Sequence, residues 1–205
     1  PMHALVSGQM LRAWGAPGFA RPDPFEEVAV ACAQHDVAWM PGEAAPSFDA
    51  ATGRPHQFRA VGAKDHAPMW AACVRQAIMS WGPWVGLLVS RHGSRIYGSS
   101  QDRHRVSPED AEAAATYMTE QAALRARLLA LVGATEAQLE TAAALVAVTD
   151  ALSLAACGGI VTLGGSGMAP LEGGGAVTLQ LTEGDGVMTV SPWPCLLVER
   201  PAPSS

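Results

Sequence analysis

The stretch AAALVAVTDALSLAAC, residues 142–157, places one aspartate, Asp150, inside a long apolar helical run. Apolar residues occupy positions 145–148, 151, 152 and 154 around it. A carboxylate is seldom fully buried unless it is paired or binds a metal, because its desolvation costs several kcal/mol. Asp150 therefore either faces solvent on a polar stripe with Thr149 and Ser153, or has a partner inside the fold.

Helical spacing of apolar residues dominates the chain up to residue 157. We expect helices over 3–14, from Asp23-Pro24 to about residue 36, over 66–80, over 84–97, from Ser107 to about Val132, and from Thr135 to Cys157. Asp23 and Ser107 each precede a proline and are expected as N-caps. Residues 39–64 are rich in proline and glycine and are expected to form a long ordered loop.

The pattern changes after Gly158. The segments AVTLQL (176–181), VMTV (187–190) and CLLVER (195–200) are expected as strands, with a turn at EGDG (183–186). A chain of 205 residues is long enough to bury a core as one domain. The sequence thus predicts a mainly α fold, with a helical bundle over 1–157 and a small antiparallel β-sheet over 158–205 packed on the same domain.

The charge distribution limits the classes of partner. The net charge is −6, and only RHGSR (91–95) and QDRHR (101–105) concentrate arginine. This argues against a nucleic-acid or membrane-surface function and leaves a small anionic molecule as the expected partner. The oligomeric state is left open.

Several absences point to a cytoplasmic protein. No run reaches the ~18 uninterrupted apolar residues of a membrane span, and the start of the chain lacks a secretory signal pattern. The four cysteines show no CxxC spacing, so neither a zinc knuckle nor a disulfide framework is indicated. The first residue is Pro1, so we expect native residues to precede it, or Pro1 to be left from cleavage of a tag.

An adjacent His-Asp pair, His35-Asp36, ends the second expected helix. Imidazole nitrogen and carboxylate oxygen are suitable donors for zinc, iron or manganese, and neighbouring residues at a helix end can face one ion. The pair can also be a simple helix cap, with the histidine at the negative end of the helix dipole. His3, taken alone, is a surface residue near the start of the chain.

A second cluster of polar residues lies in SRHGSRIY, residues 90–97. His92 is a candidate for the chemistry, and Arg91 and Arg95, one helical turn apart, are candidates to bind a phosphate. The alternative for both arginines is a solvated basic face. The remaining histidines, His56, His66 and His104, are interpreted as surface residues, with His66 the strongest exception.

The order His3, His35-Asp36, Asp150 resembles the HD superfamily of metal-dependent phosphohydrolases. The segments QHDVAW (34–39), APSFDAATGRPHQF (45–58) and LLVSRHGSRIYG (87–98) are similar to an uncharacterised bacterial family with an HD-like helical core and flanking β structure. PMHALVSGQMLRAWG (1–15), TDALSL (149–154) and SPWPC (191–195) also fit, so the resemblance spans nearly the whole chain.

The resemblance implies an HD-domain-like bundle in which His3, His35, Asp36 and Asp150 bind one or two divalent transition-metal ions, of iron, manganese, zinc or nickel. His92 and the segment from Trp39 to Phe58 would line the pocket, with Trp39 contacting the substrate. The implied function is hydrolysis of a phosphate ester or nucleotide. Two alternatives stay open: an HD-type iron oxygenase, and a non-catalytic metal-binding or sensor domain.

Overall fold

The computed structural model describes residues 2–56, 61–98, 107–158, 167–184 and 187–196. Most of them are helical: α1 (Met2–Ala13), α2 (Phe25–Gln34), the 3₁₀ turn η1 (Val37–Trp39), α3 (Met40–Ala44), α4 (Ala63–Trp81), α5 (Pro83–Gly98), α6 (Pro108–Val132) and α7 (Glu136–Gly158). The strands are β1 (Met168–Pro170), β2 (Ala176–Thr178), β3 (Gln180–Gly184) and β4 (Val187–Ser191). The expectation of a mainly α fold with a small antiparallel β part near the C-terminus is confirmed.

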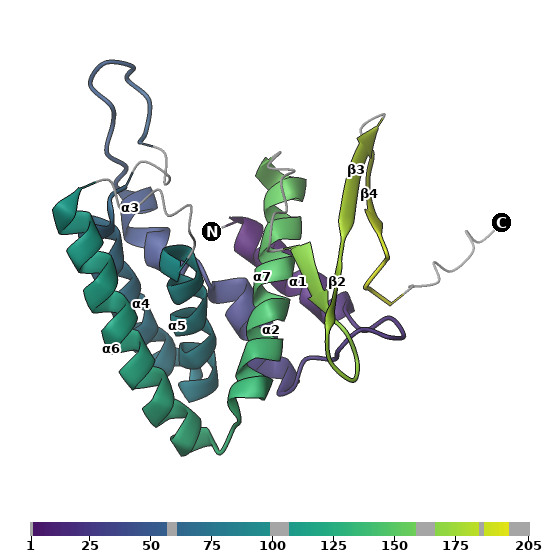
Figure 1. The fold of residues 1–205 in the computed structure, drawn as a ribbon. Helices are drawn as coiled ribbons and strands as arrows, with labels where there is room; N and C mark the ends of the chain where they lie inside the picture. Colours follow the sequence, from purple (N-terminus) through teal and green to yellow (C-terminus); the bar gives the residue numbers. More distant parts are fainter. Residues whose placement is uncertain (1, 57–60, 99–106, 159–166, 185–186, 197–205) are drawn as a thin grey trace.

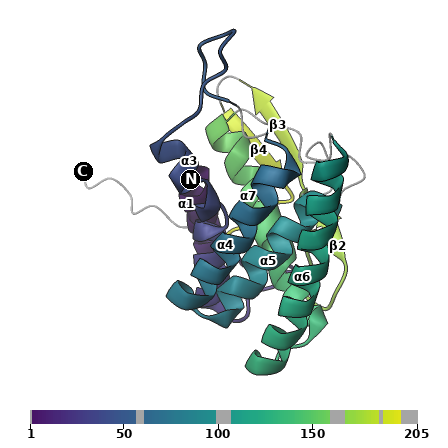
Figure 2. The same ribbon diagram turned by 90° about the vertical axis from the view of Figure 1, so that its left-hand side faces the viewer.

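The long helices form two groups that pack on each other (Figure 1 and Figure 2). In one group α4, α5 and α6 contact one another, and in the other α1 packs on α2 and α7. Helix α5 joins the groups because it also contacts α2 and α7. The large fully buried side chains, such as Trp70, Tyr97, Leu11 and Leu145, come from both groups, so they share one core.

Helix α7 carries the apolar run that contains Asp150. In length and composition it could cross a membrane, the one such helix in the described part of the chain, and 61% of that stretch is buried within the fold. It packs against α1, α2, α5 and β1. The apolar composition of α7 is therefore accounted for by its contacts in the core.

The strands form two separate pairs instead of one sheet. β1 pairs with β2, and β3 pairs with β4, both antiparallel. The segment AVTLQL, expected as one strand, is divided at Leu179, which is buried and whose N–H donates to the carbonyl of Gly167 at 2.8 Å. Cys195 forms a bridge with Trp14, and Leu196 is in no strand, while residues 197–200 of the expected last strand lie outside the described residues.

The expected loop over residues 39–64 is partly helical. It begins with the end of η1 and with α3, in which Pro41 lies in the first turn, where its missing N–H breaks no helical hydrogen bond. Beyond α3 a bridge between Phe48 and Pro55 closes a turn, and residues 57–60 lie outside the described part. The expected loop is therefore confirmed only in its second half.

The two predicted N-caps have different outcomes. Ser107 caps α6 as expected, because its hydroxyl accepts a hydrogen bond from the N–H of Asp110 at 3.1 Å. The cap at Asp23 was wrong, since Pro24 is the N-cap residue of α2 and no side chain bonds there. Pro24 is extended, which places the Asp23 carboxylate one residue too early to reach the free N–H groups of the helix.

The close approach of α1 and α2 depends on Gly8. A Cβ at this position would lie 2.7 Å from the Cβ of Ala33. Gly8→Ala should therefore lower the free energy of unfolding by about 1–3 kcal/mol, because the two helices must separate. Gly42→Ala in α3 is the control, since nothing lies within 4 Å of a Cβ there. Equal thermal stabilities of the two variants would contradict this account of the packing.

Candidate metal centre

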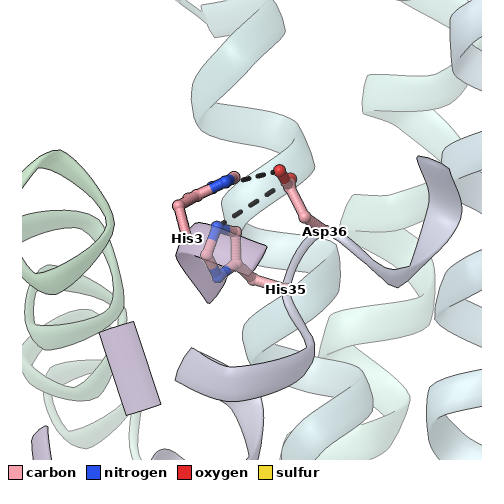
Figure 3. Close-up of side chains that lie close together, drawn as sticks. All are labelled: His3, His35 and Asp36. Carbon is pink, nitrogen blue, oxygen red and sulfur yellow. Dashed lines mark ion pairs between the residues drawn. The ribbon is translucent and has the colours of Figure 1, made fainter. Parts of the chain in front are cut away.

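The four residues implied as metal ligands lie together in the structure. His3 is in the first turn of α1, His35 and Asp36 follow α2, and Asp150 is on α7. The Nε2 of His3 lies 3.2 Å from Asp36 and 3.3 Å from Asp150, and the Nε2 of His35 lies 3.2 Å from Asp150. Figure 3 shows the imidazoles of His3 and His35 directed at the Asp36 carboxylate. Asp150 thus points inward, and the alternative in which it faces solvent does not hold.

The backbone at the end of α2 explains how adjacent residues serve one site. His35 keeps helical dihedral angles, whereas Asp36 turns to φ −101° and ψ 11°, in the bridge region where many active-site residues are found. The 3₁₀ turn η1 begins directly afterwards. This bend directs both side chains into the space beside α1 and α7.

Three of the distances between donor atoms, at 3.2–3.3 Å, are those expected of two donors on one small ion. Metal bonds of about 2.0–2.2 Å to nitrogen and oxygen place neighbouring donors about 3–3.5 Å apart in tetrahedral or octahedral geometry. Two overlapping groups, His3 with His35 and Asp36, and His35 with His92 and Asp150, have all their donor atoms within 4.8 Å of one another. Both groups consist of nitrogen and oxygen donors, which suit zinc, iron, manganese or nickel.

The protonation of His35 is fixed by its surroundings. Its Nδ1 lies 2.8 Å from the carbonyl oxygen of Cys32, which can only accept, so Nδ1 carries a proton and donates. In the neutral ring the Nε2 then presents a lone pair toward Asp36 and Asp150. A histidine that donates one N–H to a backbone carbonyl and offers the other nitrogen to a shared space has the arrangement of a metal ligand.

The two carboxylates require positive charge close by. Burial alone would raise the pKa of Asp150, but hydrogen bonds from His3 and His35 and the charge of His35 outweigh burial and hold that pKa far below its ordinary value. The pKa of Asp36 is lowered in the same way by His3 and His35. Burial would lower the pKa of His3, yet the two aspartates raise it to about 9, and they also raise the pKa of His35. Without a metal, protonated imidazoles balance the carboxylates; a divalent cation would replace those protons with the same charge.

His92 completes the group from α5. Its side chain is buried, its Nε2 lies 4.0 Å from Asp150, and its ring centre lies 4.8 Å from that of His35. Its Nδ1 is a buried atom with no hydrogen-bond partner among the described residues. Burial, followed by the charge of His35, lowers the pKa of His92 to about 4. His92 is therefore a neutral imidazole with a lone pair at the edge of the donor set.

A family model described as "Protein of unknown function (DUF3891)" matches residues 1–196. The chain belongs to the DUF3891 family. The resemblance to an uncharacterised family is thereby confirmed, and the description of the family assigns no chemistry. Comparison of this DUF3891 chain with curated proteins and with solved structures gives no match.

Aromatic side chains form one wall of the centre in this DUF3891 protein. The indole N–H of Trp70 donates to Nε2 of His66 at 2.7 Å, and Nδ1 of His66 bonds to the hydroxyl of Tyr97. Trp70 lies 5.6 Å from His92 and Trp39 lies 5.0 Å from His66, measured between ring centres. The half-buried Trp39 thus contacts His66, which bonds to Trp70, and Trp70 in turn lies beside His92.

Trp70 and Tyr97 of this wall were not among the predicted site residues. Trp70 follows His66 by four residues on the apolar face of α4, and this spacing was the available signal. Among the histidines interpreted as surface residues, His66 is buried, as its exception allowed, and His56 is exposed. His104 lies outside the described residues.

The two arginines beside His92 differ in their contacts. Arg91 donates through Nε and an amino group to the carboxylate of Glu140 on α7, the second contact at 2.7 Å. Arg95 is half-buried and has no hydrogen-bond or ion-pair partner within the described ranges. Burial, and then the positive charge of Arg91, lowers the pKa of Arg95. Arg95 is attracted to Glu140 only at longer range, so its guanidinium hydrogen bonds to no anion among the described residues.

The charge balance predicts how stability depends on pH without metal. Because the pKa of His3 rises from 6.5 to about 9 on folding, its contribution is full below pH 6.5 and is lost as the pH rises through 9. The chelator-treated protein should therefore lose thermal stability between these values. His3→Gln, which cannot be protonated, should show a smaller loss over the same interval. Identical pH profiles would mean that His3 does not balance the aspartates.

Proposed function

We propose that the protein is a metal-dependent hydrolase of the HD type, acting on a phosphate ester or nucleotide. The observation that carries the proposal is the convergence of His3, His35, Asp36 and Asp150, with three of the distances between histidine and aspartate donors at 3.2–3.3 Å. Asp150 sits in an apolar helix where an uncompensated carboxylate would be costly. The locked orientation of His35 adds support, because only its Nε2 faces the shared space.

The four residues would hold one divalent ion of zinc, manganese, iron or nickel. Such an ion polarises a phosphoryl oxygen and lowers the pKa of bound water toward ~7. The protein's own part is to fix two imidazoles and two carboxylates around the ion. The donors fall into two overlapping groups that share His35, so the arrangement accommodates one ion or two.

His92 would act on the proton of the attacking water. Its buried ring is neutral, and Nδ1 has no hydrogen-bond partner among the described residues, so His92 can accept a proton as a general base. Its position beside Asp150 also allows it to serve as a further ligand. Arg95 would bind the anionic part of the substrate, and Trp39 would border the substrate on the aromatic side.

A second candidate function is iron-dependent oxygenation. His35, His92 and Asp150 form a group of two histidines and one carboxylate, the donor set of non-haem iron oxygenases. In this alternative His92 is a ligand and not a base. The metal found in the purified protein distinguishes the candidates, since tightly bound iron with a visible absorption band favours oxygenation.

Elemental analysis tests the centre directly. The unaltered protein should contain about one transition-metal ion per chain, and His35→Ala and Asp150→Ala should contain almost none. His35 belongs to both groups of donors, and Asp150 contacts both His3 and His35. His56→Ala, which alters an exposed histidine, should keep the metal. Stoichiometric metal in Asp150→Ala would count strongly against the ligand assignment.

Steady-state kinetics with phosphate monoesters and nucleotides tests the role of Arg95. Arg95→Ala should raise KM by about 10- to 100-fold, since a hydrogen bond to a charged group contributes about 1.5–3 kcal/mol. Its metal content should stay unchanged. Arg12→Ala is the control, because Arg12 pairs with Glu26 on the surface. An unchanged KM in Arg95→Ala would remove Arg95 from the substrate site.

A further inference from the structure

A buried group of three hydrogen-bonding side chains lies one helical turn from the metal donors. It consists of Ser7 on α1, Cys32 on α2 and Thr149 on α7, and all three have no exposed surface. Ser7 Oγ donates to Thr149 Oγ1 at 2.8 Å. The Thr149 hydroxyl donates to the carbonyl oxygen of Leu145 at 2.9 Å. Sγ of Cys32 lies 3.3 Å from Oγ1 of Thr149. We call Ser7, Cys32 and Thr149 the hydroxyl–thiol cluster.

Each member of the hydroxyl–thiol cluster is coupled along its own helix to a proposed ligand. Ser7 follows His3 by four residues, so the two share one face of α1. Cys32 supplies the carbonyl that orients His35. Thr149 directly precedes Asp150. The cluster therefore joins the three helices that carry the donors.

Packing alone does not require these polar groups. The same helices bury apolar side chains one turn away, namely Ala4 and Leu11 on α1 and Val28 on α2. A buried hydroxyl is costly unless it is hydrogen-bonded, and valine would fill the place of Thr149 with similar volume. Hydrogen bonds, unlike apolar contacts, are directional, and they fix both the spacing of two helices and their rotation about their axes.

We propose that the hydroxyl–thiol cluster, with Thr149 at its centre, positions the donors of the metal centre and so determines metal affinity and coordination geometry. The inference rests on the proposed function. Thr149 is a positioning residue, because it acts through other residues. It holds its neighbour Asp150 directly. Its contacts with Ser7 and Cys32 hold the helices that carry His3 and His35. Replacement of comparable supporting residues in metal sites lowers metal affinity about 10- to 100-fold.

Two substitutions of Thr149 distinguish the effect of its hydroxyl from the effect of its side-chain volume. Thr149→Val keeps the volume and removes the hydroxyl, whereas Thr149→Ser keeps the hydroxyl and removes a methyl group. Co(II) is the probe, with affinity measured by competition against a chelator and geometry by the visible absorption of the saturated protein. Thr149→Val should bind Co(II) about 10-fold or more weakly, with an altered spectrum. Thr149→Ser should retain both the affinity and the spectrum of the unaltered protein.

Two further variants are controls for a general loss of stability. Leu128→Ala makes a void in α6, which carries none of the donors, and should lower stability while leaving the Co(II) spectrum unchanged. Ser7→Ala removes the other hydroxyl of the cluster with little loss of volume, and should weaken Co(II) binding even if Thr149→Val does not fold.

The outcomes distinguish the two proposals. If the unaltered protein binds Co(II) and Thr149→Val has the same affinity and spectrum, the positioning role is overturned and the proposed function stands. The same follows if Thr149→Ser is as defective as Thr149→Val, because the methyl group would then be responsible. If the unaltered protein binds no Co(II), the proposed function fails, and the inference fails with it.

Discussion

Two carboxylates, Asp36 and Asp150, face the same imidazole nitrogen of His3 in a region largely closed to water. Two negative charges this close repel each other strongly where few water molecules can screen them. The histidines around the two carboxylates offset that repulsion. His3 and His35 supply protons in the absence of metal, and in the proposed function a divalent cation would supply the positive charge instead.

The helices around the centre make that compensation unavoidable. Asp150 cannot turn to solvent without rotating α7, whose other faces are packed against α1, α2, α5 and β1. Asp36 is fixed by the bend between α2 and η1. The aromatic wall of Trp70 and His66 closes the side nearest His92. The apolar core therefore serves the site by confining its charges, as well as by stabilising the fold.

Helical periodicity predicted the helices because its signal is local. The grouping of His3, His35, Asp36 and Asp150 came from the resemblance to HD enzymes, since these residues, apart from the adjacent pair His35-Asp36, are far apart in the sequence. Helical periodicity identified α1, α4, α5 and α7 within a few residues at each end. By contrast, the break in the expected strand AVTLQL depends on the hydrogen bond from Leu179 to Gly167. The orientation of Arg91 depends on its ion pair with Glu140. Each contact joins residues that do not belong to the same helix or strand, so no periodic pattern predicts it.

Helix α1 connects the metal centre to the opposite end of the chain. Its first turn carries His3, while the residues at and after its last turn bond to the C-terminal segment: Gly15 donates to the carbonyl of Pro194, and Leu196 donates to that of Ala13. A helix transmits displacement along its axis because its backbone hydrogen bonds resist stretching. A displacement of residues 194–196 would thus move His3, one of the proposed ligands, although the two lie at opposite ends of α1.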